Sequence, residues 1–154
     1  MPKIVLDKPE HYNRIADFVS EQIGYGNSKH GNFVAVGLED DGKLIAGVVY
    51  SDFNGSNITA GIAGIGKQWL TRGFLHFIFY YPFCQAGASR ITACVETTNL
   101  QSQRFVEKLG FELEFSMKRA GRFGDLLIYR MFREDCRYLE RHHVIRKILS
   151  PASS

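Results

Sequence analysis

The feature that most constrains the fold is a strand-like segment followed closely by a helix with clear start and stop signals. Residues 91–96 (ITACVE) are apolar and β-branched, which favours a buried strand. Residues 99–109 are predicted to form a helix, because Asn99 is a good N-cap and Gly110 a good C-cap. Residues 111–118 are predicted to form another strand. A strand, a helix and a strand in this order require a sheet with a helix packed on it.

The remaining segments add strands and helices before and after that unit. The turn sequence Asp-Asp-Gly at residues 40–42 joins two strands into a hairpin. Pro82 is expected to kink a helix or to mark its last turn. The order of segments predicts a single α+β domain over residues 1–154, with a mixed, mostly antiparallel sheet of six to seven strands flanked by helices. The predicted strands are residues 3–6, 33–38, 44–51, 57–63, 91–96, 111–118 and 126–132, and the predicted helices run from the N-cap Asp7 to about Gly24 and over residues 71–85, 99–109 and 134–149.

The cysteine count and the hydropathy limit the class of protein. The three cysteines are odd in number and form no CxxC pair, which argues against both a disulfide framework and a zinc site. The first residues form no apolar signal segment, and the most apolar stretch, residues 74–84, is too short to span a bilayer. We therefore predict a cytoplasmic protein without a metal ion or a membrane partner. The nearly all-apolar stretch permits a homodimer.

The net charge of +3 is concentrated near the C-terminus. Residues 1–129 hold 13 bases and 13 acids, whereas residues 130–149 hold six bases and three acids. This predicted basic helix is either a solvated helix face or a surface for nucleic acid. Few aromatic residues lie between the bases and no nucleic-acid-binding motif is present. The solvated face is therefore the preferred interpretation, and a nucleic-acid partner is disfavoured.

A second informative segment is residues 68–73 (QWLTRG), which lie between a predicted strand and a predicted helix. Backbone amides at a helix start have no partner within the helix and favour negative charge, so a diphosphate is a natural ligand there. Thr71 can cap the helix, and Arg72 adds a positive charge. Many helices begin after a polar turn without binding a ligand, so this segment alone is a weak signal.

Residues 58–132 resemble the core of the GNAT superfamily of acetyltransferases, because several short motifs occur in the order and at the spacing of that family. That family carries a Gln/Arg-x-x-Gly-x-Gly/Ala loop before its central helix, and Gln68, Thr71 and Gly73 fall on this pattern. The resemblance covers about half of the chain. The family pattern then continues with an Ala-Gly pair, a strand, an Asn and a Leu-Gly-Phe helix end, which are here Ala86-Gly87, residues 91–95, Asn99 and residues 109–111.

The resemblance implies an acetyl-CoA-dependent N-acetyltransferase that moves an acetyl group to a primary amine, either a small molecule or a protein N-terminus. The arm of CoA would lie in a V-shaped opening between residues 57–63 and 91–95. The implied cofactor contacts are backbone groups near Ala63 and Ile65, the loop residue Gln68, the diphosphate-binding amides of Trp69, Leu70, Thr71, Arg72, Gly73 and Phe74, and the side chain of Asn99.

Two positions depart from the family pattern. Thr71 replaces a glycine of the loop, and Val106 stands where many members have a Tyr that is thought to protonate the leaving thiolate. We take Ser102 as the substitute acid and Glu96 as a candidate general base, although a surface carboxylate is an equally good interpretation of Glu96. The alternative function is a degenerate fold that binds CoA or a partner without turnover. The Asn99-x-x-Ser102 spacing also resembles the Rim-type acetyltransferases of ribosomal-protein N-termini.

Overall fold

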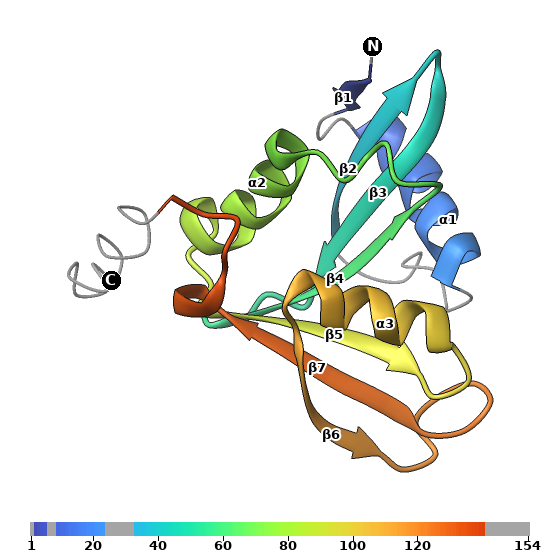
Figure 1. Cartoon of the computed structure of the whole chain (residues 1–154), viewed down its shortest axis with the longest axis vertical. Coiled ribbons are helices and arrows are strands. Elements are labelled where there is room, and N and C mark those ends of the chain that lie inside the picture. The colour runs from blue at the N-terminus through green and yellow to red at the C-terminus, as the bar shows by residue number, and fades with distance from the viewer. Residues whose placement is uncertain (1, 6–8, 24–32, 141–154) are drawn as a thin grey trace.

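The computed structural model describes residues 2–5, 9–23 and 33–140, which form one seven-stranded sheet with three α-helices (Figure 1). The strand order is β1-β2-β3-β4-β5-β7-β6, and every neighbouring pair is antiparallel except β4 and β5. This confirms the predicted α+β class and the mixed, mostly antiparallel sheet. The strands are β1 Lys3–Val5, β2 Phe33–Asp40, β3 Lys43–Ser51, β4 Asn57–Gly64, β5 Arg90–Glu96, β6 Glu112–Met117 and β7 Leu126–Phe132, and the helices are α1 Pro9–Ile23, α2 Arg72–Tyr80 and α3 Leu100–Leu109.

The helices cover the sheet through two separate apolar cores. The buried residues Ile15, Ala16 and Val19 of α1 recur at helical spacing and pack against β2, β3 and β4. The larger core contains the buried side chains of α2 and α3 together with those of β3, β4, β5 and β7. Two layers of side chains therefore enclose the sheet, and α2 and α3 share one of them.

The parallel pair β4 and β5 opens like a V. The two strands pair only at their first residues, where Asn57, Ile58 and Thr59 lie opposite Arg90, Ile91 and Thr92. Beyond these positions β4 stays paired with β3 through Gly64, whereas β5 pairs with β7 through Glu96. The second half of β4 consequently has a free edge on the side of β5, as the family resemblance implied.

The predicted helix over residues 71–85 changes geometry at its proline. The α-helix ends at Tyr80 and continues as a π-helix over Tyr81–Gln85. Pro82 has no N–H to donate, and the Ala86 amide donates instead to the Tyr81 carbonyl, five residues earlier, over 2.8 Å. Because the apolar side chains of this helix pack inside one chain, its composition is explained without a second subunit.

The predicted C-terminal α-helix is wrong over residues 134–140. Arg133–Asp135 form a single 3-10 turn, and Cys136 is extended, with φ −79° and ψ 110°. The physical reason is burial: Cys136 and Leu139 are inside the core, and the Tyr138 ring stacks on Phe79 with centroids 4.8 Å apart. This packing outweighs the helical propensity of the segment. Residues 141–149 of the predicted helix, like the predicted N-cap Asp7, lie outside the described residues.

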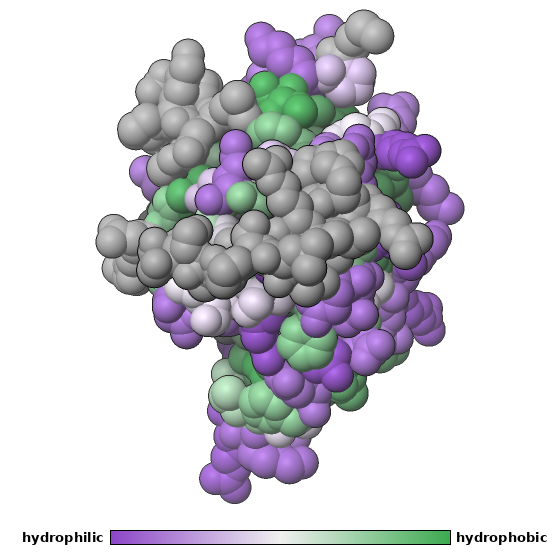
Figure 2. Space-filling view, turned by 90° about the vertical axis from the view of Figure 1, so that its left-hand side faces the viewer, coloured by the Kyte–Doolittle hydropathy of each residue, from purple (hydrophilic) through white to green (hydrophobic). Residues whose placement is uncertain are grey.

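The exposed apolar surface of the described chain gathers near the edge strand β6. Leu113, Phe115 and Met117 of β6 and Phe123 of the following turn are all exposed. Figure 2 shows apolar residues among polar ones toward the lower end of the molecule, the end at which β6 lies in Figure 1. Within the described residues no helix is long and apolar enough to cross a bilayer.

Candidate functional site

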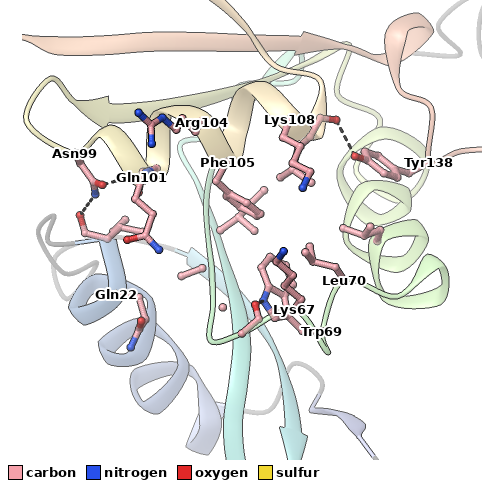
Figure 3. A pocket seen from close by; sticks show the side chains of 18 of the residues that line it. Gln22, Lys67, Trp69, Leu70, Asn99, Gln101, Arg104, Phe105, Lys108 and Tyr138 are labelled. Atoms are coloured by element: carbon pink, nitrogen blue, oxygen red, sulfur yellow. Dashed lines mark hydrogen bonds between the residues drawn. The ribbon is translucent and has the colours of Figure 1, made fainter.

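A cavity of about 550 Å³ lies beside the free edge of β4 (Figure 3). One wall is the end of β4 with the loop that follows it, and the opposite wall is α3. Figure 3 shows Phe105 and Lys108 of α3 facing Lys67 and Leu70 of the loop across this space. The end of α1 and the segment after β7 close the cavity at its two ends, through Gln22 and Tyr138 respectively.

The charges around this cavity have one sign. Its lining includes four cationic side chains, and no Asp or Glu is among the described residues that line it. In a partly enclosed space such cations attract an anion more strongly than they would in open water. The Arg137 guanidinium also donates to the Lys108 carbonyl, which holds the segment after β7 against α3. The four cations are Lys67, Arg104, Lys108 and Arg137.

The backbone of β4 offers hydrogen-bonding groups to the cavity at alternate residues. The Ile65 amide donates to the Ile45 carbonyl over 2.8 Å, so it is occupied within the sheet. In an antiparallel pair the backbone groups of successive residues point alternately toward and away from the partner strand. Ile62 and Gly64 therefore direct their N–H and C=O groups to the free edge. The groups that face the cavity are shifted by one residue from the Ala63 and Ile65 of the prediction.

Trp69 supports the loop from beneath. Its indole N–H donates to the Gly66 carbonyl over 3.0 Å, and its ring lies 5.3 Å from the Phe105 ring on α3. A Cβ atom at Gly64 would stand 2.0 Å from this indole, so only glycine permits such a close approach. Trp69 is thus buried and also lines the cavity, and its ring packs the loop against α3.

The start of α2 is open to solvent at the rim of the cavity. The Thr71 hydroxyl caps the helix by accepting the Phe74 amide over 3.2 Å. The Arg72 and Gly73 amides have no acceptor within the described part of the chain. A Cβ atom at Gly73 would have no neighbour within 4 Å, so space remains beside these amides. Leu70 and Leu75, which flank this turn in the sequence, both line the cavity.

At the start of α3 the cap side chain makes two hydrogen bonds and joins two helices. The Asn99 side chain accepts the Ser102 amide over 3.0 Å and donates to the Ile23 carbonyl at the end of α1 over 3.1 Å. Asn99 borders the cavity, but its two polar atoms already connect α1 to α3. Asn99 is therefore a structural clamp between the two helices.

A smaller cavity of about 30 Å³ continues between the diverging strands. It lies between residues 60–62 of β4 and 93–96 of β5. Ser102 and Phe105 line both this cavity and the larger one, so they stand where the two meet. A volume of this size is about that of one or two small heavy-atom groups. Ser102 is half-buried at this junction.

Glu96 lines the small cavity and is buried, with 3% of its surface exposed. The interpretation as a surface carboxylate is therefore wrong. One carboxylate oxygen accepts the Arg122 amide from the turn between β6 and β7. The other oxygen, Oε2, is buried and has no hydrogen-bond partner among the described residues. A Cβ atom at Gly121 would stand 2.1 Å from Oε2, so the glycine allows the turn to close over the carboxylate.

The structure brings some of the predicted site residues together and separates others. Ala63, Trp69, Leu70, Asn99 and Ser102 line the large cavity, and Glu96 and Ser102 line the small one. Gln68, Thr71, Arg72 and Gly73 are exposed beside the cavity, Ile65 is exposed and is not among its lining residues, and the Phe74 side chain is in the core. The sequence interpretation missed Gln101, Arg104, Phe105 and Lys108, although their i, i+3, i+4, i+7 spacing was a signal that they share one helix face.

No protein-family model and no curated protein matches this sequence. Solved structures match it in shape. A spermidine N-acetyltransferase from Vibrio cholerae in complex with CoA and spermine superposes with TM-score 0.67 at 15% identity, over 87% of this chain and 96% of the other. A putative acetyltransferase from Salmonella typhimurium with acetyl-CoA superposes with TM-score 0.63 at 15% identity, over 85% of this chain and 93% of the other. A GNAT-family acetyltransferase from Streptococcus pneumoniae superposes with TM-score 0.62 at 14% identity, over 86% of this chain and 99% of the other.

The chain therefore has the fold of the GNAT acetyltransferases, as the resemblance implied. At these identities the likeness establishes the fold and leaves the individual activity to the site. The Rim-type resemblance is not supported, because the structures that match include spermidine acetyltransferases.

Proposed function

We propose that this protein is an acetyl-CoA-dependent N-acetyltransferase that acetylates a primary amine. The observation that carries this proposal is the 550 Å³ cavity at the free edge of β4, whose described lining holds four cations and no acid. An elongated ligand with phosphates at one end and a neutral arm at the other matches this distribution of charge. The cavity also narrows into the small apolar space beside Ser102, where a thioester end would fit.

The residues present suit the phosphates of CoA. The unpaired amides of Arg72 and Gly73 would receive the diphosphate at the start of α2. Lys67, Arg104 and Lys108 would neutralise the phosphate charge from both sides of the cavity. Thr71, which departs from the family glycine, uses its hydroxyl as a cap and leaves the next two amides free. The replacement is therefore compatible with anion binding.

The reacting end would lie between β4 and β5. Acetyl-CoA supplies the acetyl group as an activated thioester. The Ile62 and Gly64 backbone groups on the free edge of β4 would hold the arm and provide N–H donors for the negative charge that develops on the carbonyl oxygen. The Ser102 hydroxyl, at the junction of the two cavities, would donate a hydrogen bond or a proton to the departing sulfur.

Glu96 would act on the amine. Glu96 lines the small cavity, and its Oε2 atom is buried without a hydrogen-bond partner among the described residues, which is costly unless a ligand satisfies it. An acceptor nitrogen could donate to Oε2 and lose a proton toward it as the new amide bond forms. An α-amine has a pKa of about 8 and a lysine amine about 10.4, so an α-amine would need less help from such a base.

The acceptor class can be narrowed by experiment. A spermidine acetyltransferase of the same fold was solved with spermine, so polyamines belong beside simple amines and free peptide N-termini in an acceptor panel. Thiol release from acetyl-CoA would be followed for each amine, with N-acetylated peptides as the matched control. The proposal expects release with at least one class of free amine and none with the blocked peptide.

Calorimetry with acetyl-CoA should precede that panel. Acetyl-CoA at 100 times its Kd should raise the free energy of unfolding by about 2.7 kcal/mol. Binding without turnover on any amine would favour the degenerate alternative. The absence of both binding and a shift in melting temperature would contradict both functions.

A further inference from the structure

A third cavity, of about 400 Å³, lies at the opposite end of β4 from the proposed CoA site. It is enclosed by the beginning of β2, the end of β3 with the turn that follows, the beginning of β4, and the π-helix. The Ser89 and Arg90 amides both donate to the Ser56 carbonyl, which fixes this turn against the segment before β5. Figure 1 shows the turn between β3 and β4 beside that segment. The cavity is thus built from anchored backbone.

Aromatic side chains dominate its walls. Phe33, Tyr50, Phe53 and Tyr81 contribute to the lining, and the rings of Tyr50 and Tyr81 lie 5.0 Å apart with a tilt of 53°. The Tyr50 hydroxyl donates to the Ile78 carbonyl over 2.5 Å, so this ring is fixed in place by α2. Phe53 is 48% exposed, which is unusual for a phenylalanine and leaves an uncovered ring at the mouth of the cavity.

The charge of this cavity is opposite to that of the CoA site. Asp52 is the one charged side chain among its described lining residues. The carboxylate lies 3.4 Å from the Ser51 hydroxyl, and no ion pair to it occurs within the described part of the chain. A carboxylate without an ion-pair partner attracts cations by its charge, and the negative faces of the neighbouring aromatic rings add a cation–π attraction.

We propose that this aromatic cavity is a binding site for a small organic cation, an ammonium group carrying methyl or methylene substituents. The substituents would contact the rings of Phe33, Phe53 and Tyr81, and the positive charge would face Asp52. A cavity of this volume is in the range that holds small ligands. Inorganic cations are poorly matched, because the described lining offers a single carboxylate and no cluster of metal ligands.

The site is independent of the proposed acetyl transfer. Ile58 of β4 lines the aromatic cavity, and the nearest β4 residue that lines the large one is Ile62, four residues further along the strand, or about 13 Å. A cation bound here would not occupy the space assigned to CoA. Loss of one binding activity would therefore leave the other measurable.

Choline is a suitable probe, with 3,3-dimethyl-1-butanol as the uncharged control of the same shape. Each would be titrated into the full chain while the ring resonances of Tyr50 and Tyr81 are followed by NMR. We expect saturable shifts with choline and at least tenfold weaker binding of the neutral alcohol. Equal affinity for the two ligands, or no saturable shift with choline, would overturn the proposal.

Two variants test the residues that carry the proposal. Asp52→Asn should weaken choline binding at least fivefold, whereas Asp41→Asn should leave it unchanged. The two positions are matched, because both aspartates have φ of 54° in exposed turns and asparagine tolerates that conformation. Phe53→Ala should weaken binding by a similar factor without changing the melting temperature, since its ring is exposed. Unaltered affinity in Asp52→Asn would assign the cation elsewhere.

Discussion

The helices α2 and α3 both begin beside the same cavity, and their N-termini are used differently. At α2 the Thr71 hydroxyl satisfies one amide, and the Arg72 and Gly73 amides remain without a described acceptor. At α3 the Asn99 side chain satisfies the Ser102 amide on one side and the Ile23 carbonyl on the other. At both starts the first two amides, those of Arg72 and Gly73 in α2 and those of Leu100 and Gln101 in α3, have no acceptor among the described residues. The difference is that the cap of α3 also ties α1 to the helix start, whereas the Thr71 hydroxyl caps α2 alone.

This difference shows what an N-cap residue in a sequence does not reveal. Thr71 and Asn99 both mark a helix start, and both do so correctly. Whether the cap also joins the helix start to another element depends on groups that lie far away in the sequence. The Ile23 carbonyl is 76 residues from Asn99, and no local pattern connects them. The following predictions either break the contrast between the two helix starts or sharpen it.

The largest effect should come from the start of α2. Gly73→Glu places a carboxylate where the diphosphate is proposed to lie, and like charges at contact cost several kcal/mol. We expect CoA affinity to fall by at least about 100-fold in calorimetry. Gly73→Ala is the control, because its Cβ would meet no atom within 4 Å and should leave the affinity nearly unchanged. Normal CoA binding by Gly73→Glu would show that the phosphates lie elsewhere.

The next effect concerns the first turn of α3. Ser102→Ala removes the hydroxyl at the junction of the two cavities but keeps the amide that Asn99 caps. Removal of a general acid typically costs about 100-fold or more in turnover, so kcat for thiol release should fall by that factor. The Kd of CoA should change little. Unchanged kcat would remove Ser102 from the mechanism.

A smaller effect is expected from the cations across the cavity. Lys108→Gln keeps a polar side chain that is one atom shorter and removes the charge, so CoA affinity should fall about tenfold, as for one charge-assisted hydrogen bond. The loss should shrink as salt is added, because ions screen the exposed charge. Lys43→Gln, in the hairpin turn away from the cavity, is the matched control. A loss that does not depend on salt would point to a structural role for Lys108.

The smallest effect should appear at the start of α3. Asn99→Ala removes an N-cap and the contact with α1, which should lower the free energy of unfolding by about 1 kcal/mol in urea titration. CoA affinity should remain within about twofold, because both polar atoms of Asn99 serve the protein. Asn99→Asp, which keeps the acceptor for the Ser102 amide, should recover part of the stability. A large loss of CoA affinity with normal stability would reassign Asn99 as a ligand contact.

Local signals predicted most of the fold. The N-cap Asn99 and the C-cap Gly110, with φ of 115°, define α3 with the boundaries expected from the sequence. The C-terminal segment was predicted wrongly because the burial of Cys136 and Tyr138 against distant residues decides its conformation. Propensity measured along the chain does not contain that information.

Part of the candidate site follows from local sequence. The cap at the start of α2 follows from its own sequence, whereas the sequence alone does not decide which backbone groups near Ala63 and Ile65 face the cavity. The register with β3 decides which backbone groups reach the free edge, and the Ile65–Ile45 hydrogen bond sets that register. Likewise, the burial of Glu96 depends on the turn at Gly121 and Arg122, and Arg122 lies 26 residues further along the chain than Glu96.

Amide chemical shifts measured while CoA is added test the contrast between the two helix starts most directly. The account predicts that the Arg72 and Gly73 amides shift strongly and saturably, because the diphosphate is proposed to lie at α2, whereas the matched Leu100 and Gln101 amides of α3 move little. Strong movement at Leu100 and Gln101 with Arg72 and Gly73 unmoved would contradict it.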